Sequence, residues 1–231
     1  ILINLNKKIN KKNFLKFKKL ISRRKKKEPI AHILKIKEFW RYNFRINNDV
    51  LIPRPETEII VSEILKVINL NSSKNILDIG TGSGCILISI INERPKCKGT
   101  AIDVSKKALK VALFNAKMHQ LQNKIQFINI DVDKFNLNIY DFIVSNPPYI
   151  SSIDLKRLDD SVRLYEPHKA LSAGTDGLNI IRKIILKSRK LLKVNGKLII
   201  EIGNTHEFYT KYFLKKNGFY VNKICKDIQS L

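Results

Sequence analysis

An apolar strand, a glycine turn and a helix follow one another in the stretch Ile76-Leu77-Asp78-Ile79-Gly80-Thr81-Gly82-Ser83-Gly84-Cys85-Ile86-Leu87. Three glycines at alternate positions let the backbone turn tightly and approach a ligand closely, with the N-terminus of a helix directly behind. The spacing is Gly-x-Gly-x-Gly with Cys85 next, so it fits a dinucleotide fingerprint and a Walker loop poorly. A purely structural turn is the alternative to a cofactor loop.

Apolar runs and helical patterns alternate on both sides of this stretch. Near-continuous apolar strands separated by helices are typical of a parallel sheet that is covered on both faces. The sequence therefore predicts an α/β fold with a doubly wound sheet. The expected strands are 75–79, 99–102, 125–130, 140–144, 197–202 and a last one near 220–224, and the expected helices are 55–69, 84–92, 105–119, 176–192 and 207–216.

Two further segments precede this alternation. Aromatic and β-branched residues mix with polar ones around Asn47-Asn48-Asp49, which predicts a β-hairpin at about 38–52. Residues 1–28 carry 12 Lys and Arg and one acidic residue, and apolar residues recur there at helical spacing. We therefore expect a short basic helical arm over 1–28 and one catalytic domain over 29–231. The arm is a solvated extension, a docking helix for a partner or a weak contact with ribosomal RNA.

Composition limits the class of protein. The 231 residues have a formal net charge of +24 and 44% hydrophobic residues, which excludes an acidic disordered tail and a disulfide mini-protein. The 36 Ile, 34 Lys and 22 Asn are typical of AT-rich codons, so part of the charge reflects codon usage rather than binding to nucleic acid. Three cysteines without a C-x-x-C pair favour a reducing compartment, and no apolar run approaches the ~18 residues that span a bilayer. We expect a cytoplasmic protein without a metal site.

Two acidic residues flank the glycine turn. Asp78 lies where a carboxylate would repel a pyrophosphate but would suit a cation, such as the ammonium and sulfonium groups of S-adenosylmethionine. Asp103 ends the next expected strand, where an acidic residue can hydrogen-bond ribose hydroxyls. The combination favours a cofactor loop for S-adenosylmethionine.

The turn Asn146-Pro147-Pro148-Tyr149 follows another expected strand. Ligands of open parallel sheets bind outside the carboxyl ends of the strands, so this turn should face the same crevice as the glycine turn. Asn146 Oδ1 and the Pro147 carbonyl can both accept from one planar NH₂ group, and Tyr149 can stack on it. Two acceptors localise the nitrogen lone pair and aim it at an electrophilic methyl group, with no general base or metal required. A rigid turn without chemistry is the alternative.

These residues resemble the class I S-adenosylmethionine-dependent methyltransferases, whose sheet is Rossmann-like. Five further motifs are similar to the peptide chain release factor glutamine methyltransferases, the HemK/PrmC family, over about 29–227. The resemblance implies methyl transfer to the N5 amide of the glutamine in the Gly-Gly-Gln loop of peptide chain release factors. The motifs are Pro29-Ile-Ala-His32, Glu38-Phe-Trp40, Leu51-Ile-Pro-Arg54-Pro-Glu56-Thr-Glu58, Tyr165-Glu-Pro167 and Gly174-Thr-Asp176-Gly177.

The resemblance also implies roles for individual residues. Asn146, Pro147 and Tyr149 are the expected catalytic residues, and together with Pro148 they are expected to bind the substrate glutamine. Val132 stands where the family often has an aromatic residue near the adenine. The family also carries a larger helical N-terminal domain, so the arm is expected to be a shortened version. The residues expected to hold the cofactor are Gly80, Thr81, Gly82, Ser83, Gly84, Asp103, Val132 and Asn146.

Several alternatives stay open. Ribosomal-protein glutamine methyltransferases and adenine-N6 methyltransferases share the Asn-Pro-Pro-Tyr chemistry, although Arg54-Pro-Glu56-Thr-Glu58 resembles the release-factor branch. A base-modifying enzyme would also need a region that holds a flipped adenine, and no such insertion interrupts the chain. A basic RNA- or ribosome-binding protein with a non-catalytic methyltransferase core is an alternative of another class.

Other residues have both a structural and a functional interpretation. Arg54 and Glu56 either stabilise a proline turn or line the rim of the site. Glu201 and Gly203 either end a strand or contact the substrate. Cys85 is expected to be a small packing residue rather than a reactive thiol. The four histidines are dispersed and do not suggest metal ligands.

Overall fold

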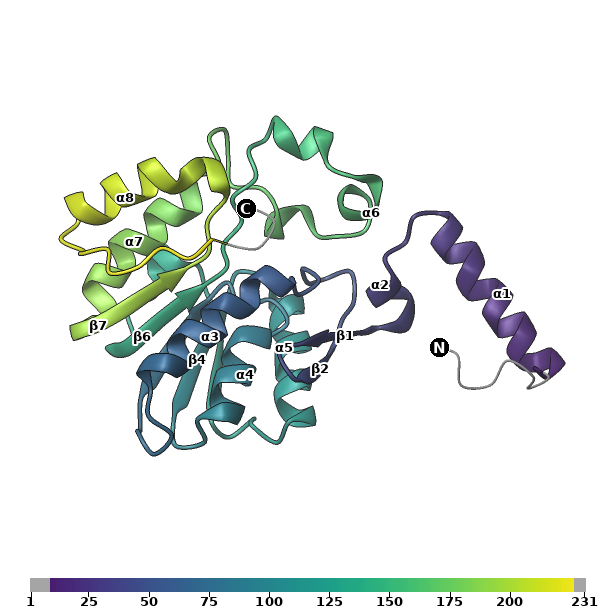
Figure 1. The fold of residues 1–231 in the computed structure, drawn as a ribbon, viewed down its shortest axis with the longest axis horizontal. Coiled ribbons are helices and arrows are strands. Elements are labelled where there is room, and N and C mark those ends of the chain that lie inside the picture. Colours follow the sequence, from purple (N-terminus) through teal and green to yellow (C-terminus); the bar gives the residue numbers. More distant parts are fainter. Residues whose placement is uncertain (1–8, 227–231) are drawn as a thin grey trace.

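The computed structural model describes residues 9–226 and contains a five-stranded parallel sheet with the strand order β5-β4-β3-β6-β7 (Figure 1). Helices cover both faces of this sheet, so the predicted doubly wound α/β fold is confirmed. The strands are β3 (Asn75–Ile79), β4 (Lys98–Asp103), β5 (Ile125–Asn129), β6 (Tyr140–Ser145) and β7 (Leu192–Ile200).

The central strand β3 supplies the core on both faces because successive side chains of a strand point in opposite directions. Ile76 belongs to one hydrophobic cluster, whereas Leu77 and Ile79 belong to the other. All three are at most 4% exposed. A strand that is buried on both faces is apolar throughout, which is why its sequence could be recognised.

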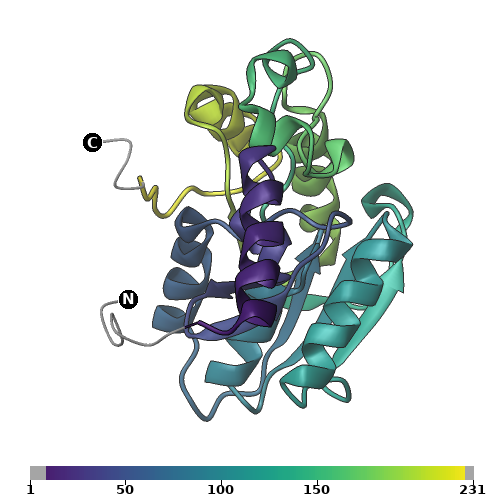
Figure 2. The same cartoon turned by 90° about the vertical axis from the view of Figure 1, so that its right-hand side faces the viewer.

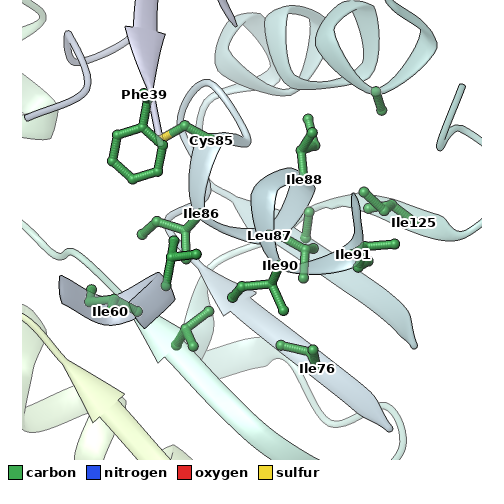
Figure 3. Packing of buried hydrophobic residues seen from close by; sticks show 14 of the residues in the cluster. Phe39, Ile60, Ile76, Cys85, Ile86, Leu87, Ile88, Ile90, Ile91 and Ile125 are labelled. Carbon is green, nitrogen blue, oxygen red and sulfur yellow. The ribbon is translucent and has the colours of Figure 1, made fainter. Parts of the chain in front are cut away.

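Helices α3 (Glu58–Val67), α4 (Cys85–Glu93) and α5 (Lys106–Met118) contribute to the first cluster, and α7 (Asn179–Leu191) contributes to the second. Helix α8 (Glu207–Lys216) packs beside α7. Figure 3 shows apolar side chains of α4 lying between the strands and the hairpin residue Phe39. These helices begin and end within three residues of the predicted bounds, except that a 3-10 turn, η1 (Pro55–Thr57), precedes α3.

The hairpin lies earlier in the chain than predicted. Strands β1 (Ile36–Phe39) and β2 (Tyr42–Arg45) pair around Trp40, whose φ is 60°. The predicted span of about 38–52 placed the turn at Asn47-Asn48-Asp49, but those residues form a separate turn that their own side chains hold. The prediction followed the polar residues, whereas burial of aromatic side chains from both strands fixes the observed pairing.

The predicted strand near 220–224 is wrong, because that segment has no regular secondary structure. Tyr220 is 88% exposed and Ile224 is 44% exposed, so little apolar burial favours a strand there. Lys223 instead forms a salt bridge with Glu63 of α3, at 2.8 Å. Strand β7 starts five residues earlier than predicted, with a register irregularity opposite Tyr140.

The basic segment contains the predicted helix, α1 (Lys11–Lys25), which Asn10 caps through its side chain. Figure 1 shows α1 standing apart from the sheet and its helices, and Figure 2 views the molecule from that side. None of its residues is buried. Residues 1–8 of the predicted arm and the end of the predicted domain, 227–231, lie outside the described residues.

The remaining elements are short. The loop from β6 to α7 carries several of them, and an isolated bridge between Ile150 and Ser172 closes it. No helix within 9–226 is long and apolar enough to cross a membrane. The short elements are α2 (Ile30–Leu34), α6 (Asp160–Arg163), η2 (Val132–Lys134), η3 (Asp154–Arg157), η4 (His168–Ala170) and η5 (Asn204–His206).

Candidate functional site

The glycine turn and the Asn146 turn lie side by side at the carboxyl edge of the sheet. Strands β3 and β6 are parallel neighbours, and each turn follows directly from one of them. Ser145 Oγ, at the end of β6, donates to the carbonyl of Ile79, at the end of β3, at 2.7 Å. The two turns can therefore face one ligand in one crevice.

Positive φ angles make the glycine turn possible. Gly80, Gly82 and Gly84 have φ of 73°, 55° and 81°, a region that other residues rarely adopt. The amide of Gly80 donates to the carbonyl of Ile102 at 2.9 Å, and that of Gly82 donates to Asp103 Oδ2 at 3.0 Å. A Cβ on Gly80 would meet nothing within 4 Å, so this part of the turn has open space beside it.

Burial perturbs both acidic residues beside the turn. Asp78 is 0% exposed and accepts from the Thr81 hydroxyl at 2.6 Å, and burial raises its pKa to about 7. Burial also raises the pKa of Asp103, whose charge adds to the shift of Asp78. Neither carboxylate forms an ion pair within the described chain. A cation bound at this edge of the sheet would offset the cost of burying these two charges.

Both oxygens of Asp103 already accept backbone hydrogen bonds. Oδ2 accepts from Gly82, and Oδ1 accepts from the amide of Ser105 at 2.8 Å. A carboxylate oxygen has two lone pairs, so each keeps one acceptor position for a further donor. Asp78 differs, because its complete burial leaves no surface for direct contact with a ligand.

Val132 occupies a different environment from the one expected beside an adenine. It starts η2 and is only 7% exposed, within the hydrophobic cluster that also contains Phe135 and Tyr140. Most of its side chain therefore stabilises the core. The predicted adenine contact stays a prediction, with little side-chain surface to provide it.

A chain of hydrogen bonds starts at Asn146. Its Nδ2 donates to Thr57 Oγ1 at 2.8 Å, and the Thr57 hydroxyl donates to Glu201 Oε2 at 2.7 Å. The Tyr149 hydroxyl lies 3.5 Å from the other oxygen, Glu201 Oε1. These residues come from η1, from the loop after β6 and from the end of β7, so only the tertiary fold brings them together.

The acid–base properties of this network exclude one role for Tyr149. Burial raises the pKa of Tyr149 to about 12, and the charge of Glu201 adds to that shift. Burial also raises the pKa of Glu201, and the nearby charge of Glu56 contributes. The phenol therefore stays protonated at neutral pH and acts as a donor and a flat apolar surface rather than as a base.

Close backbone packing holds Tyr149 and the residue after it in place. The amide of Ile150 donates to the carbonyl of Leu171 at 3.1 Å. A Cβ on Gly177 would lie 2.5 Å from the Tyr149 carbonyl oxygen, and one on Gly203 would lie 3.2 Å from its ring. Gly203 therefore acts through packing against the aromatic ring, whereas Glu201, directly after β7, enters the polar network.

Arg54 has a structural partner. It forms a 2.6 Å salt bridge with Glu166, whose side chain is 1% exposed, and Glu166 also accepts from the amide of Ile52 at 3.1 Å. The two family-like motifs around Arg54 and Glu166 are thus in contact. Within residues 9–226, Glu56 forms no such salt bridge, and it lines one groove with Tyr149, Glu201 and others.

Cys85 is a packing residue, as expected. It is 8% exposed, and burial raises the pKa of its thiol to about 12, so the reactive thiolate is disfavoured. Within residues 9–226, no group of three His, Cys, Asp or Glu residues could hold a metal ion.

Thr57 is the site residue that sequence reasoning missed. It stands inside the motif at 51–58, but threonine before a helix ordinarily indicates an N-cap. In the structure its side chain makes no capping bond to α3 and points into the network instead. Spacing alone gives no signal for this use of the hydroxyl.

The chain is similar in sequence to known methyltransferases. The family model described as "Methyltransferase small domain" matches residues 57–159. A "Release factor glutamine methyltransferase" of Thermodesulfovibrio yellowstonii is 37% identical over 216 residues, which cover 93% of this chain and 77% of that protein. A "Bifunctional methyltransferase" of Rickettsia typhi is 38% identical over 249 residues, covering 100% of this chain and 48% of that protein. The chain thus spans about half the length of the bifunctional relatives.

A solved structure supports the fold alone. The ribosomal protein L11 methylase of Lactobacillus delbrueckii subsp. bulgaricus aligns with a TM-score of 0.56 and 18% identity. The alignment covers 76% of this chain and 75% of that one. At this identity the similarity concerns the arrangement of helices and strands, which is that of a class I methyltransferase.

Proposed function

The chain belongs to the release factor glutamine methyltransferase family, and from this premise we propose that it methylates a glutamine side chain of a peptide chain release factor. The methyl group would pass from the sulfur of S-adenosylmethionine to the N5 amide of the glutamine in the Gly-Gly-Gln loop, which would leave S-adenosylhomocysteine and release one N–H proton to water. One observation carries the proposal: the Asn146 turn and the glycine turn are neighbours at the carboxyl edge of the sheet.

Asn146 and Pro147 would act on the substrate amide. An amide nitrogen is a poor nucleophile because its lone pair is delocalised into the carbonyl group. Asn146 Oδ1 and the Pro147 carbonyl can accept its two hydrogens, which orients the NH₂ group and localises the lone pair. The ring of Tyr149 would hold the plane of the carboxamide. Positioning and hydrogen bonding then supply the catalysis without a general base.

The residues of the glycine turn fit the cofactor. Open space beside Gly80 leaves room for it, and a cation there would offset the cost of burying the charges of Asp78 and Asp103. When bound, S-adenosylmethionine would supply an electrophilic methyl group on a positively charged sulfur. Asp103 has free acceptor positions for ribose hydroxyls, and Asp78 would act through its field. The residues proposed to hold the cofactor are Gly80, Thr81, Gly82, Ser83, Gly84, Asp103, Val132 and Asn146.

An assay of the full chain tests this proposal. The protein is incubated with methyl-labelled S-adenosylmethionine and a purified release factor, and mass spectrometry locates the label. We expect label on the glutamine of the Gly-Gly-Gln loop, with Asn146→Ala reducing the rate about 10²-fold. Asn123→Ala, at an exposed position, is the matched control and should keep the rate. Label on adenine, no label at all, or an unchanged rate in Asn146→Ala would contradict the proposal.

A second proposal concerns the basic helix α1. It carries eight Lys and Arg and no acidic residue, and none of its side chains is buried. This supports a weak, salt-dependent contact with ribosomal RNA, in addition to the catalytic role or instead of it. A division into a basic arm over 1–28 and a catalytic domain over 29–231, in a cytoplasmic protein, is consistent with both proposals.

A further inference from the structure

Thr57 and Glu201 form a hydrogen bond that has no role in the proposed methyl transfer as described above. Thr57 is 2% exposed, and its hydroxyl lies between the Asn146 amide and the Glu201 carboxylate. A buried hydroxyl at this position would ordinarily cap helix α3, but the Thr57 side chain makes no capping bond. The fold thus holds a buried threonine whose two side-chain hydrogen bonds both go to residues of the candidate site.

The direction of these hydrogen bonds follows from the chemistry of the partners. An ionised carboxylate can only accept, so the Thr57 hydroxyl must donate its single hydrogen to Glu201. The Thr57 oxygen then has only lone pairs left for Asn146, and the Asn146 amide must present its NH₂ end to it. The carbonyl end of the same amide, Oδ1, is therefore the end that faces away from Thr57.

We propose that Thr57 and Glu201 are positioning residues that fix the orientation of the Asn146 amide, so that Oδ1 is turned toward the substrate nitrogen. This inference rests on the proposed function. An amide in the opposite orientation would present NH₂ to the NH₂ of the substrate glutamine, which puts two donors face to face. The hydrogen bonds from Asn146 to Thr57 and from Thr57 to Glu201 disfavour that orientation before any substrate binds.

Tyr149 supports the acceptor role of Glu201. Its hydroxyl lies near Glu201 Oε1, and Asn146 is also close enough to stabilise the carboxylate. Glu201 is thus surrounded by donors from three residues, and Glu56 is the other acidic group close to it. This arrangement favours an acceptor at position 201 and keeps Tyr149 on the same carboxylate as Thr57.

Steady-state kinetics of full-chain variants test the inference. Thr57→Val keeps the shape of the side chain and removes the hydroxyl, so we expect kcat to fall about 10-fold, as for the loss of one net hydrogen bond. Glu201→Gln replaces one acceptor with a donor and should also lower kcat, by about 5-fold or more. Thr57→Ser restores the hydroxyl and should recover most of the rate lost in Thr57→Val. Affinity for S-adenosylmethionine, measured by calorimetry, should stay within about 2-fold in all three.

A matched variant separates positioning from loss of packing. Thr210→Val removes another buried hydroxyl, on α8, which has no hydrogen-bond partner within residues 9–226. It should keep kcat. If Thr57→Val and Thr210→Val lower kcat equally, or if Thr57→Ser does not recover the rate, the inference is overturned.

A double-mutant cycle gives the sharpest result. If Thr57 acts only through the Asn146 amide, Thr57→Val should cost nothing further in an Asn146→Ala background. An equal loss in both backgrounds would overturn the inference while leaving the proposed function intact. Absence of methylation by the wild-type chain would overturn both, so the two failures are distinguishable.

Discussion

At the scale of single residues, Asp78 shows how burial of a carboxyl group makes the stability of the fold depend on pH. Its carboxyl is fully buried, with the Thr81 hydroxyl as its hydrogen-bond donor. Burial raises its pKa from 3.8 to about 7, so the folded chain binds this proton more tightly than the unfolded chain does. The stability that the protonated form contributes is complete below about pH 4 and is lost as pH rises toward 7.

Asp78→Asn should remove this dependence because the amide carries no charge at any pH. At pH 8 the variant should melt about 5 °C or more above the wild type, and the difference should shrink toward pH 5. Thermal denaturation followed by circular dichroism at several pH values measures this. Asp154→Asn, at an exposed carboxylate, is the control and should follow the wild type. A constant difference between pH 5 and pH 8 would contradict the assignment.

At the scale of elements, a partly buried salt bridge joins two distant segments. Glu166 follows α6, and it holds both the guanidinium of Arg54 and the amide of Ile52 in front of η1. These contacts fix the start of the segment that carries Thr57. The contacts of Glu166 therefore influence the site by holding η1 in place rather than by touching a substrate.

Removing the acidic partner should destabilise this junction. Glu166→Ala leaves the Arg54 guanidinium without its partner and the Ile52 amide without an acceptor, and we expect a loss of about 2–3 kcal/mol in the free energy of unfolding. Urea denaturation measures this loss. Asp154→Ala breaks an exposed ion pair with Arg157 and should change stability by less than about 1 kcal/mol. Equal effects of the two variants would refute the structural role of Glu166.

At the scale of the whole molecule, the basic helix α1 lies apart from the hydrophobic clusters that stabilise the fold. Helix α1 buries no side chain, whereas the two large hydrophobic clusters lie on the two faces of the sheet. Figure 1 shows the same separation, with α1 set apart from the layers. Changes to the charge of α1 should therefore affect binding to anionic partners and leave the stability of the fold nearly unchanged.

Replacing five lysines of α1 with glutamine tests this separation. If about four of these lysines neutralise phosphates, log K for single-stranded RNA should fall with log salt at a slope near −3 in the wild type and be much flatter in the variant. The melting temperature should stay the same. The α1 positions are Lys11, Lys12, Lys16, Lys18 and Lys19, and the control positions, on α5 and α8, are Lys107, Lys110, Lys117, Lys215 and Lys216. If the α1 variant and the control variant lose the same amount of RNA affinity, a specific role for α1 would be contradicted.

Some features could be predicted from the sequence because they depend on neighbouring residues. The strand bounds of β3 were predicted to the residue, since a strand buried on both faces is apolar throughout. The glycine and Asn146 turns follow consecutive neighbours in the sheet, so their proximity followed from parallel topology. The hairpin turn and the segment 220–224 were not predictable in this way, because burial against distant residues decides whether they pair.

The doubly wound sheet, the glycine turn and the proline-stiffened turn could be inferred without coordinates, because each depends on local patterns of apolar residues, glycine and proline. The contacts of Thr57 with Asn146 and with Glu201 arise from the folding of the whole chain, since the bonded residues lie 89 and 144 positions apart in the sequence. The direction of a hydrogen bond depends on which groups are in contact, and no spacing along a chain encodes that. The orientation of the amide is therefore a property of the folded molecule.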